Sequence, residues 1–182
     1  MSTQDVVNSF ARVSVEPTDM IEHMALIKAY SQQCRSAVEF GVYDCTSTWA
    51  LLAGGPERLT SYDIERRREV DDVEAAAKDS GTIFQFVLAD SAKVEIDEID
   101  LLFIDSMHTY EHLSKELAMH AGRVRKYILM HDTTTFGNVD QTGTGRGLWP
   151  AVEEFLASHT EWFVLERRTN CHGLTVLQRV LA

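Results

Sequence analysis

The feature of this sequence that most constrains its fold is an alternation of short, nearly continuous apolar runs with segments of helical length. Seven runs predict strands, at residues 37–42, 58–64, 83–88, 99–104, 126–130, 162–166 and 173–177. Strands that are apolar throughout are typical of a parallel sheet covered on both sides by helices. We therefore predict an α/β, Rossmann-like fold: a seven-stranded, mostly parallel sheet with helices on both faces. Only a short turn separates the last two runs, which predicts one antiparallel edge strand.

The segments between the runs predict the covering helices. Helical spacing and stop signals place them at residues 18–34, 47–52, 65–78, 110–122 and 148–158. Residues 133–147 have no apolar periodicity and predict a loop of the length that lids and binding loops have. We expect a single domain overall, in which residues 1–35 form an N-terminal helical cap segment before the sheet domain at 36–182. The chain up to Pro17 is expected to be partly mobile.

Composition and charge exclude several kinds of partner. The 182 residues include 17 Lys and Arg against 28 Asp and Glu, a formal net charge of −11 that repels phosphate backbones. No apolar run is long enough to cross a bilayer, and the N-terminus lacks the pattern of a signal peptide. Cys34, Cys45 and Cys171 are odd in number and scattered, which favours reduced thiols over a disulfide framework. We expect a cytoplasmic protein with no nucleic-acid or membrane partner.

Acidic side chains and histidines follow the predicted strands where each one ends. They are Asp44, Asp63, Asp90, Asp105, His108, His131 and Asp132. Because ligands bind beyond the carboxyl ends of parallel strands, we expect these residues to share one crevice. The first turn, residues 41–47, has neither GxGxxG nor GxxxxGK[ST], which excludes a P-loop. An acidic crevice favours a ligand with a positive charge and ribose hydroxyls, and S-adenosylmethionine (SAM) is such a ligand.

Three acidic residues have expected roles around such a ligand. Glu39 orients the first turn, Asp63 accepts hydrogen bonds from both ribose hydroxyls, and Asp90 faces the adenine amino group. Alternatives stay open, since Asp63 is also a suitable N-cap for the helix beginning at Glu65 and Asp90 is a suitable cap for a turn.

Two sets of residues carry a resemblance to known enzymes. Val38–Tyr43, followed by Ser47 and Thr48, resembles the first motif of class I SAM-dependent methyltransferases. A second set resembles the metal-dependent small-molecule O-methyltransferases related to the macrocin and mycinamicin enzymes and to cephalosporin hydroxylase: Asp100–Asp105, His108, Tyr110, His131–Thr133 and Gly173–Leu177. The resemblance spans roughly residues 36–178. It implies the class I methyltransferase fold, with 36–182 as the SAM-binding domain, and the cofactor-binding residues Glu39, Gly41, Val42, Tyr43, Ser47, Asp63, Ile64, Asp90, Ser91 and Asp105.

The resemblance also implies a catalytic pair and a metal site. The general base of the family corresponds to His108, beside Asp105, and a histidine with a pKa of about 6.5 can take a proton at neutral pH. The Mg²⁺ ligands correspond to Asp105, His131 and Asp132, where His131 replaces an acidic residue. Magnesium prefers oxygen ligands, so His131 favours manganese, iron or zinc.

Together these features predict SAM-dependent O-methylation of a small hydroxylated molecule, a sugar or natural product, with or without a divalent metal. Two alternatives remain: a non-catalytic small-molecule binding module, since His131 and Cys45 depart from the family pattern, and a nicotinamide-dependent oxidoreductase, which the missing glycines disfavour. Because only a short segment precedes the first strand, we expect a shallow acceptor pocket, or one completed by the 133–147 loop and a second subunit of a homo-oligomer. The Cys171–His172 pair is predicted to be structural.

Overall fold

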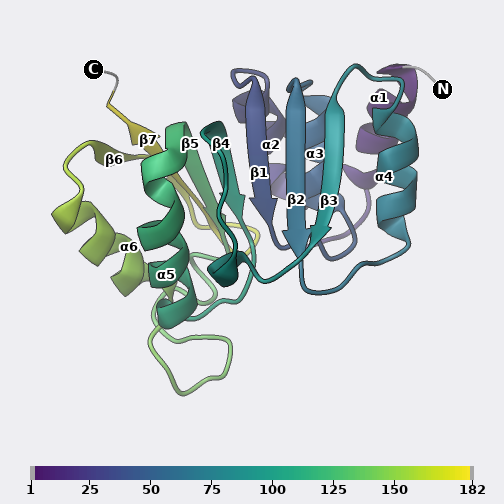
Figure 1. Ribbon diagram of the computed structural model, residues 1–182. Helices are drawn as coiled ribbons and strands as arrows, with labels where there is room; N and C mark the ends of the chain where they lie inside the picture. Colours follow the sequence, from purple (N-terminus) through teal and green to yellow (C-terminus); the bar gives the residue numbers. More distant parts are fainter. Residues whose placement is uncertain (1–2, 181–182) are drawn as a thin grey trace.

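A computed structural model of the protein describes residues 3–180 and contains one seven-stranded sheet (Figure 1). The strands are β1 (Ser36–Phe40), β2 (Arg58–Asp63), β3 (Ile83–Leu88), β4 (Ile99–Ile104), β5 (Val124–His131), β6 (Trp162–Arg168) and β7 (Leu174–Arg179). Their order across the sheet is β3-β2-β1-β4-β5-β7-β6. Strands β1 to β5 pair in parallel, and β7 is antiparallel to both β5 and β6. The predicted mostly parallel sheet is confirmed. Its antiparallel strand belongs to the edge pair, in which β6 is outermost.

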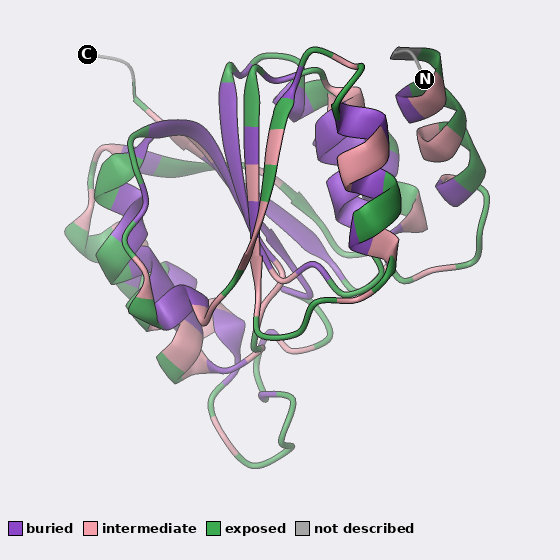
Figure 2. Cartoon of the chain, turned by 45° about the vertical axis from the view of Figure 1, so that its right-hand side comes forward, coloured by how far each residue is buried: buried purple, intermediate pink, exposed green. Residues whose placement is uncertain are grey.

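Helices cover both faces of the sheet, as predicted (Figure 1). They are α1 (Thr3–Val13), α2 (Met24–Ser31), α3 (Thr46–Ala53), α4 (Glu69–Ala77), α5 (Tyr110–His120) and α6 (Leu148–Ser158), with short 3-10 turns η1 (Ile21–His23), η2 (Ser91–Lys93) and η3 (Ala121–Arg123). In β4, Leu101 and Phe103 pack into the core shared with α1–α4, whereas Leu102 and Ile104 pack into the core shared with α5 and α6. Two cores explain why the strand is buried at every position, and buried residues line both sides of the sheet in Figure 2.

The N-terminal segment differs from the expectation of a mobile stretch before Pro17. It forms α1, whose Val6 and Val13 are buried and whose Phe10 is partly buried against the α1–α4 core. These three positions, spaced four and three apart, are the apolar stripe of a surface helix. Among residues 3–180, none of the helices combines the length and apolar character needed to span a lipid bilayer.

Two connections position the functional site. The expected helix at 65–78 begins only at Glu69, because Asp63 Oδ1 accepts a hydrogen bond from Glu65 N (2.9 Å) and holds the preceding residues in a bend. The predicted loop at 133–147 is confirmed, with one isolated bridge between Val139 and Arg146. It projects beyond the carboxyl ends of the strands (Figure 1).

Candidate active site

A cavity of about 600 Å³ opens where the carboxyl ends of β1 to β4 meet. This volume lies within the usual range for small-molecule sites. The structure brings twelve of the predicted site residues together in its wall: Gly41, Val42, Tyr43, Asp44, Ser47, Asp63, Ile64, Asp90, Ser91, Asp105, His108 and Asp132. The other two, Glu39 and His131, do not line the cavity and lie buried behind it.

The side chain of Glu39 anchors the first turn through hydrogen bonds. It is fully buried, and Ser47 Oγ donates to Oε1 (2.6 Å) while Thr48 Oγ1 (2.8 Å) and Ser61 Oγ (2.6 Å) donate to Oε2. Burial raises the pKa of Glu39 to about 7, although the three hydroxyl donors act in the opposite direction. Glu39 thus joins β1 to β2 and to the start of α3, as expected of a residue that orients the turn.

Asp63 fixes the same turn from the side of β2. Its Oδ2 accepts hydrogen bonds from the backbone N–H groups of Val42 (2.7 Å) and Tyr43 (3.1 Å). Its Oδ1 accepts a hydrogen bond from Glu65 N in the bend before α4. Asp63 is therefore not a helix N-cap, because α4 begins at Glu69 and its N-cap position is Arg68. Each carboxylate oxygen has about two lone-pair sites, which leaves acceptor capacity toward the cavity that Asp63 lines.

The turn after β1 passes very close to the end of β4. Gly41 has φ +84°, and a Cβ atom there would lie 2.1 Å from the backbone oxygen of Asp105. Only glycine fits this approach. Tyr43 (φ 47°) and Cys45 (φ 66°) also adopt the left-handed region. Cys45 therefore occupies a glycine-like conformation, which explains why a glycine would be expected there.

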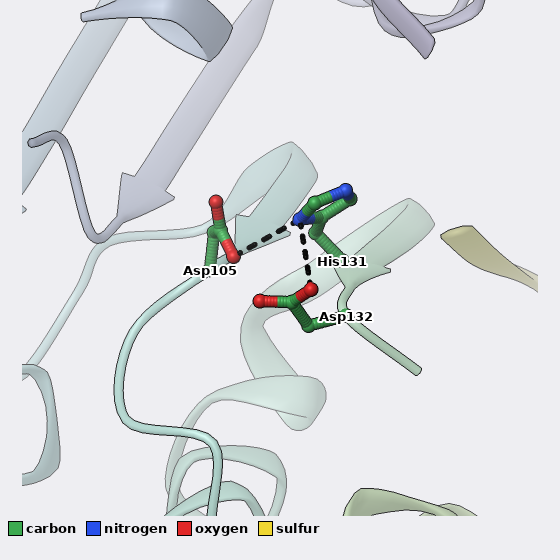
Figure 3. A group of neighbouring side chains, drawn as sticks. All are labelled: Asp105, His131 and Asp132. Atoms are coloured by element: carbon green, nitrogen blue, oxygen red, sulfur yellow. Dashed lines mark ion pairs between the residues drawn. The ribbon is translucent and has the colours of Figure 1, made fainter. Parts of the chain in front are cut away.

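Asp105, His108, His131 and Asp132 form one cluster at the ends of β4 and β5. His108 Nε2 lies 3.2 Å from Asp105 Oδ1 and 3.1 Å from Asp132 Oδ2, and its ring stacks on Phe136. His131 Nδ1 lies 3.3 Å from Asp105 Oδ1 and 3.8 Å from Asp132 Oδ1 (Figure 3). The cluster joins the predicted catalytic pair to all three predicted metal ligands.

The charges in this cluster shift one another's pKa values. Burial alone would raise the pKa of Asp105, yet the contacts with His108 and His131 lower it to about 2. Burial alone would lower the pKa of both histidines, yet the two carboxylates raise that of His131 to about 9 and that of His108 above 6.5. Burial raises the pKa of Asp132. The carboxylates of Asp105 and Asp132 therefore stabilise a positive charge between them.

The donor set fits a divalent metal ion. One ligand atom each from Asp105, His131 and Asp132 lies within 4.8 Å of the others. His131 Nε2 is 3.1 Å from the backbone oxygen of Cys171, which fixes the ring, while the buried Nδ1 faces the carboxylates without a hydrogen-bond partner among residues 3–180. Metal-binding histidines are held in this way, with the second nitrogen on a carbonyl. A proton and a metal ion would compete for Nδ1.

Several cavity residues were not predicted from the sequence. Ser106 directly follows Asp105, so its strand-end position was a usable signal. Gln141 comes from the predicted binding loop, and its Oε1 accepts a hydrogen bond from His108 N (2.9 Å). His112, on α5, and Met20, before η1, also line the cavity without any motif to mark them.

Comparisons with known proteins identify the family of the chain. Residues 59–179 match the protein family described as rhamnosyl O-methyltransferase/CmcI. No curated protein matches the sequence.

Solved structures share the fold. A protein from Corynebacterium glutamicum is 18% identical, with a TM-score of 0.69 over 99% of this chain and 90% of that one. A 1,6-didemethyltoxoflavin-N1-methyltransferase from Burkholderia thailandensis, with bound 1,6-didemethyltoxoflavin and S-adenosylhomocysteine (SAH), is 14% identical, with a TM-score of 0.67 over 98% and 87%. An O-methyltransferase from Bacillus cereus in complex with SAH is 13% identical, with a TM-score of 0.64 over 97% and 90%. At these identities the likeness shows the Rossmann-like fold of methyltransferases.

Proposed function

This chain belongs to the rhamnosyl O-methyltransferase/CmcI family of SAM-dependent methyltransferases, and we propose that it methylates a hydroxyl group of a small metabolite, a sugar or natural product, with help from a divalent metal ion. The observation that carries the proposal is the position of the Asp105–His131–Asp132 cluster beside a cavity whose other wall is the turn held by Asp63. A cofactor site and a charged reaction site thus share one cavity.

Each part of the cavity has a proposed task. Asp63 and the turn at Gly41–Tyr43 bind the ribose of SAM, and Asp90 and Ser91 lie where its adenine would be. The acceptor oxygen attacks the methyl carbon, the carbon–sulfur bond breaks, and the sulfonium becomes a neutral thioether. The carboxylates of Asp105 and Asp132 favour a proton on His108 Nε2. With another cation held by those carboxylates, Nε2 would be neutral and would take the proton that the hydroxyl loses. A metal ion held by the three-residue cluster would lower the pKa of that hydroxyl.

The surroundings of the cavity belong to the same proposal. Met20 and Asp19 reach the cavity from the N-terminal segment, which supports residues 1–35 as a cap segment. The 133–147 loop contributes Gln141, and a second subunit of a homo-oligomer would complete the acceptor pocket. A cytoplasmic location and a small-molecule acceptor, rather than nucleic acid or membrane, complete the proposal.

The test combines calorimetry with a methyl-transfer assay. We expect SAH to bind, and methyl-labelled SAM to label at least one acceptor in a panel of sugars and hydroxylated natural products. EDTA should lower turnover, and Mn²⁺ or Mg²⁺ should restore it. Absence of heat at high micromolar SAH would contradict the cofactor. Turnover that survives both EDTA and Asp132→Ala would contradict only the metal.

A further inference from the structure

Glu116, in the middle of α5, is a fully buried carboxylate that the proposed chemistry does not use. Its Oε1 accepts hydrogen bonds from Ser91 Oγ (2.5 Å) and from Ser106 Oγ (2.7 Å). His112 Nε2 lies 3.2 Å from the same oxygen. Ser91 follows β3 and Ser106 follows β4, so a single carboxylate oxygen joins the ends of two strands that are not neighbours in the sheet.

Packing does not account for a glutamate at this position. Its second oxygen, Oε2, is buried and has no hydrogen-bond partner within residues 3–180. A buried polar atom without a partner destabilises the folded state, and an apolar side chain would avoid this cost. What distinguishes Glu116 from an apolar residue is its contact with His112 and its hydrogen bonds from the two serines.

The hydrogen bonds to Glu116 determine whether the serine hydroxyls donate or accept hydrogen bonds toward a ligand. A hydroxyl has one proton and two lone pairs. Ser91 and Ser106 both direct their proton at Glu116 Oε1, while both residues line the cavity. Ser91 Oγ also lies 3.1 Å from His112 Nε2, which can use one of its two lone pairs. With the lone pairs that remain, both serine oxygens act as acceptors toward the cavity. The carboxylate of Asp90, which lines the same end of the cavity, is an acceptor as well.

The position of Ser91, Ser106 and Asp90 in the cavity indicates which part of SAM they face. The methyl group of SAM has to lie near the Asp105–Asp132 cluster, on the side of β4 and β5. The ribose lies at Asp63, so the base extends toward Ser91 after β3, and Glu116 Oε1 holds Ser106 close to Ser91. Adenine presents an amino group with two N–H donors on its six-membered ring, and a 6-oxo base presents a carbonyl acceptor instead. Acceptors on the protein match the first and repel the second.

We propose that Glu116 is a positioning residue that fixes Ser91 and Ser106 as hydrogen-bond acceptors and thereby makes the cavity specific for the amino group of adenine. The inference rests on the SAM dependence of the family and on neither the acceptor nor the metal. Glu116 acts through the serines and does not line the cavity.

The test compares the dissociation constants of SAH and S-inosylhomocysteine by calorimetry. In the wild type we expect S-inosylhomocysteine to bind at least about 30-fold more weakly, since a site built for one hydrogen-bonding pattern strongly rejects another. In Glu116→Gln the amide can also donate to the serines, whose protons are then free to turn outward. The ratio of the two constants should fall below about 5-fold. A general loosening of the structure would weaken the binding of both ligands and leave the ratio of their dissociation constants unchanged.

Two further variants complete the experiment. Glu111→Gln, at an exposed site on the same helix, should keep the wild-type ratio. Ser106→Ala removes one acceptor from the cavity wall and should lower the ratio several-fold, which tests the inference even if Glu116→Gln does not fold. A wild type that binds both ligands equally, or a folded Glu116→Gln or Ser106→Ala protein with the wild-type ratio, overturns the inference. Binding of neither ligand would instead overturn SAM dependence itself.

Discussion

The two sides of the cavity are built in opposite ways. On the β1–β2 side, the carboxylates of Glu39 and Asp63 receive hydrogen bonds on every oxygen, from three hydroxyls and three backbone N–H groups. On the β4–β5 side, Asp105 and Asp132 face histidines, and His131 Nδ1 is buried without a hydrogen-bond partner among residues 3–180. Every carboxylate oxygen of Glu39 and Asp63 on the first side therefore has a hydrogen-bond donor within the protein. The negative charge on the second side is balanced only when a cation, either a proton or a metal ion, lies between its carboxylates.

Left-handed backbone occurs on both sides of the cavity, at Tyr43 and Cys45 after β1 and at Asp132 after β5. Asp132 has φ 60°, a left-handed conformation that costs a non-glycine residue roughly 1–2 kcal/mol. It holds the Asp132 carboxylate against His108, with 3.1 Å between Oδ2 and Nε2. Strained backbone of this kind persists where the surrounding structure over-determines it, often at reaction sites. The comparison predicts that changes on the β4–β5 side affect turnover, and that changes on the β1–β2 side affect cofactor affinity and stability.

Removing the charge of Asp132 gives the largest expected effect. Asp132→Asn keeps a residue type that tolerates the left-handed conformation but loses a carboxylate of the cluster. We expect kcat to fall about 10²–10³-fold, the scale of a lost acid–base or metal contribution, while the dissociation constant of SAH changes less than about threefold. Calorimetry and a methyl-transfer assay measure the two quantities. Asp97→Asn, at an exposed site between β3 and β4, is the control. A parallel loss of SAH affinity would refute the division.

Glu39→Gln tests the opposite side through the pH dependence of stability. The pKa of Glu39 is raised from 4.5 to about 7 by burial, so the folded state binds more protons than the unfolded state between these values. The stabilisation is fully present below about pH 4.5 and is lost as pH rises through about 7. Glutamine does not titrate.

Relative to the wild type, Glu39→Gln should therefore gain on the order of 3 kcal/mol between pH 4.5 and pH 8. Urea denaturation at a series of pH values measures this gain. Glu153→Gln, at an exposed site on α6, should show no such trend. A constant difference between Glu39→Gln and wild type across this range would show that folding does not raise the pKa of Glu39.

Much of the fold could be predicted because its signals are local. The bounds of β4, Ile99–Ile104, agree with the apolar run, since both faces of that strand are buried. The stripe of Val6, Phe10 and Val13 was present in the sequence but short, and α1 was missed. The start of α4 at Glu69 depends on a hydrogen bond from Glu65 N to Asp63, and no residue pattern reveals it.

In the candidate site, too, some residues have a local sequence signal and others do not. Residues such as Asp63, Asp105 and Asp132 could be found because parallel strands bring their carboxyl ends to one edge. Glu116 could not, because a glutamate on a helix resembles any solvated charge until the packing of α5 buries it. The contact between Cys171 and the cluster likewise depends on tertiary structure, since the backbone oxygen of Cys171 lies at hydrogen-bond distance from His131 Nε2.

Replacing the histidine of the cluster should change which metal binds. His131→Asp converts the donor set to three carboxylates, which favours Mg²⁺ over Mn²⁺ relative to the wild type. We expect Mn²⁺ affinity to fall roughly 10- to 100-fold, and Mg²⁺ to compete better. Electron paramagnetic resonance of Mn²⁺ measures this without turnover. His159→Asp, at a residue outside the cluster after α6, is the control. An unchanged order of preference would mean that His131 is not a ligand.

The smallest expected effect comes from Asp63→Asn. An amide oxygen can accept from the N–H groups of Val42 and Tyr43 or from that of Glu65, but the amide nitrogen then faces a donor. The ribose also loses a charged acceptor, which is worth about tenfold in SAH affinity. Because the β4–β5 cluster is untouched, kcat at saturating SAM should stay within about threefold of wild type. Asp72→Asn, at an exposed site on α4, should alter neither quantity. If kcat fell while SAH affinity held, Asp63 would belong to the reaction side, and the contrast between the two sides would be wrong.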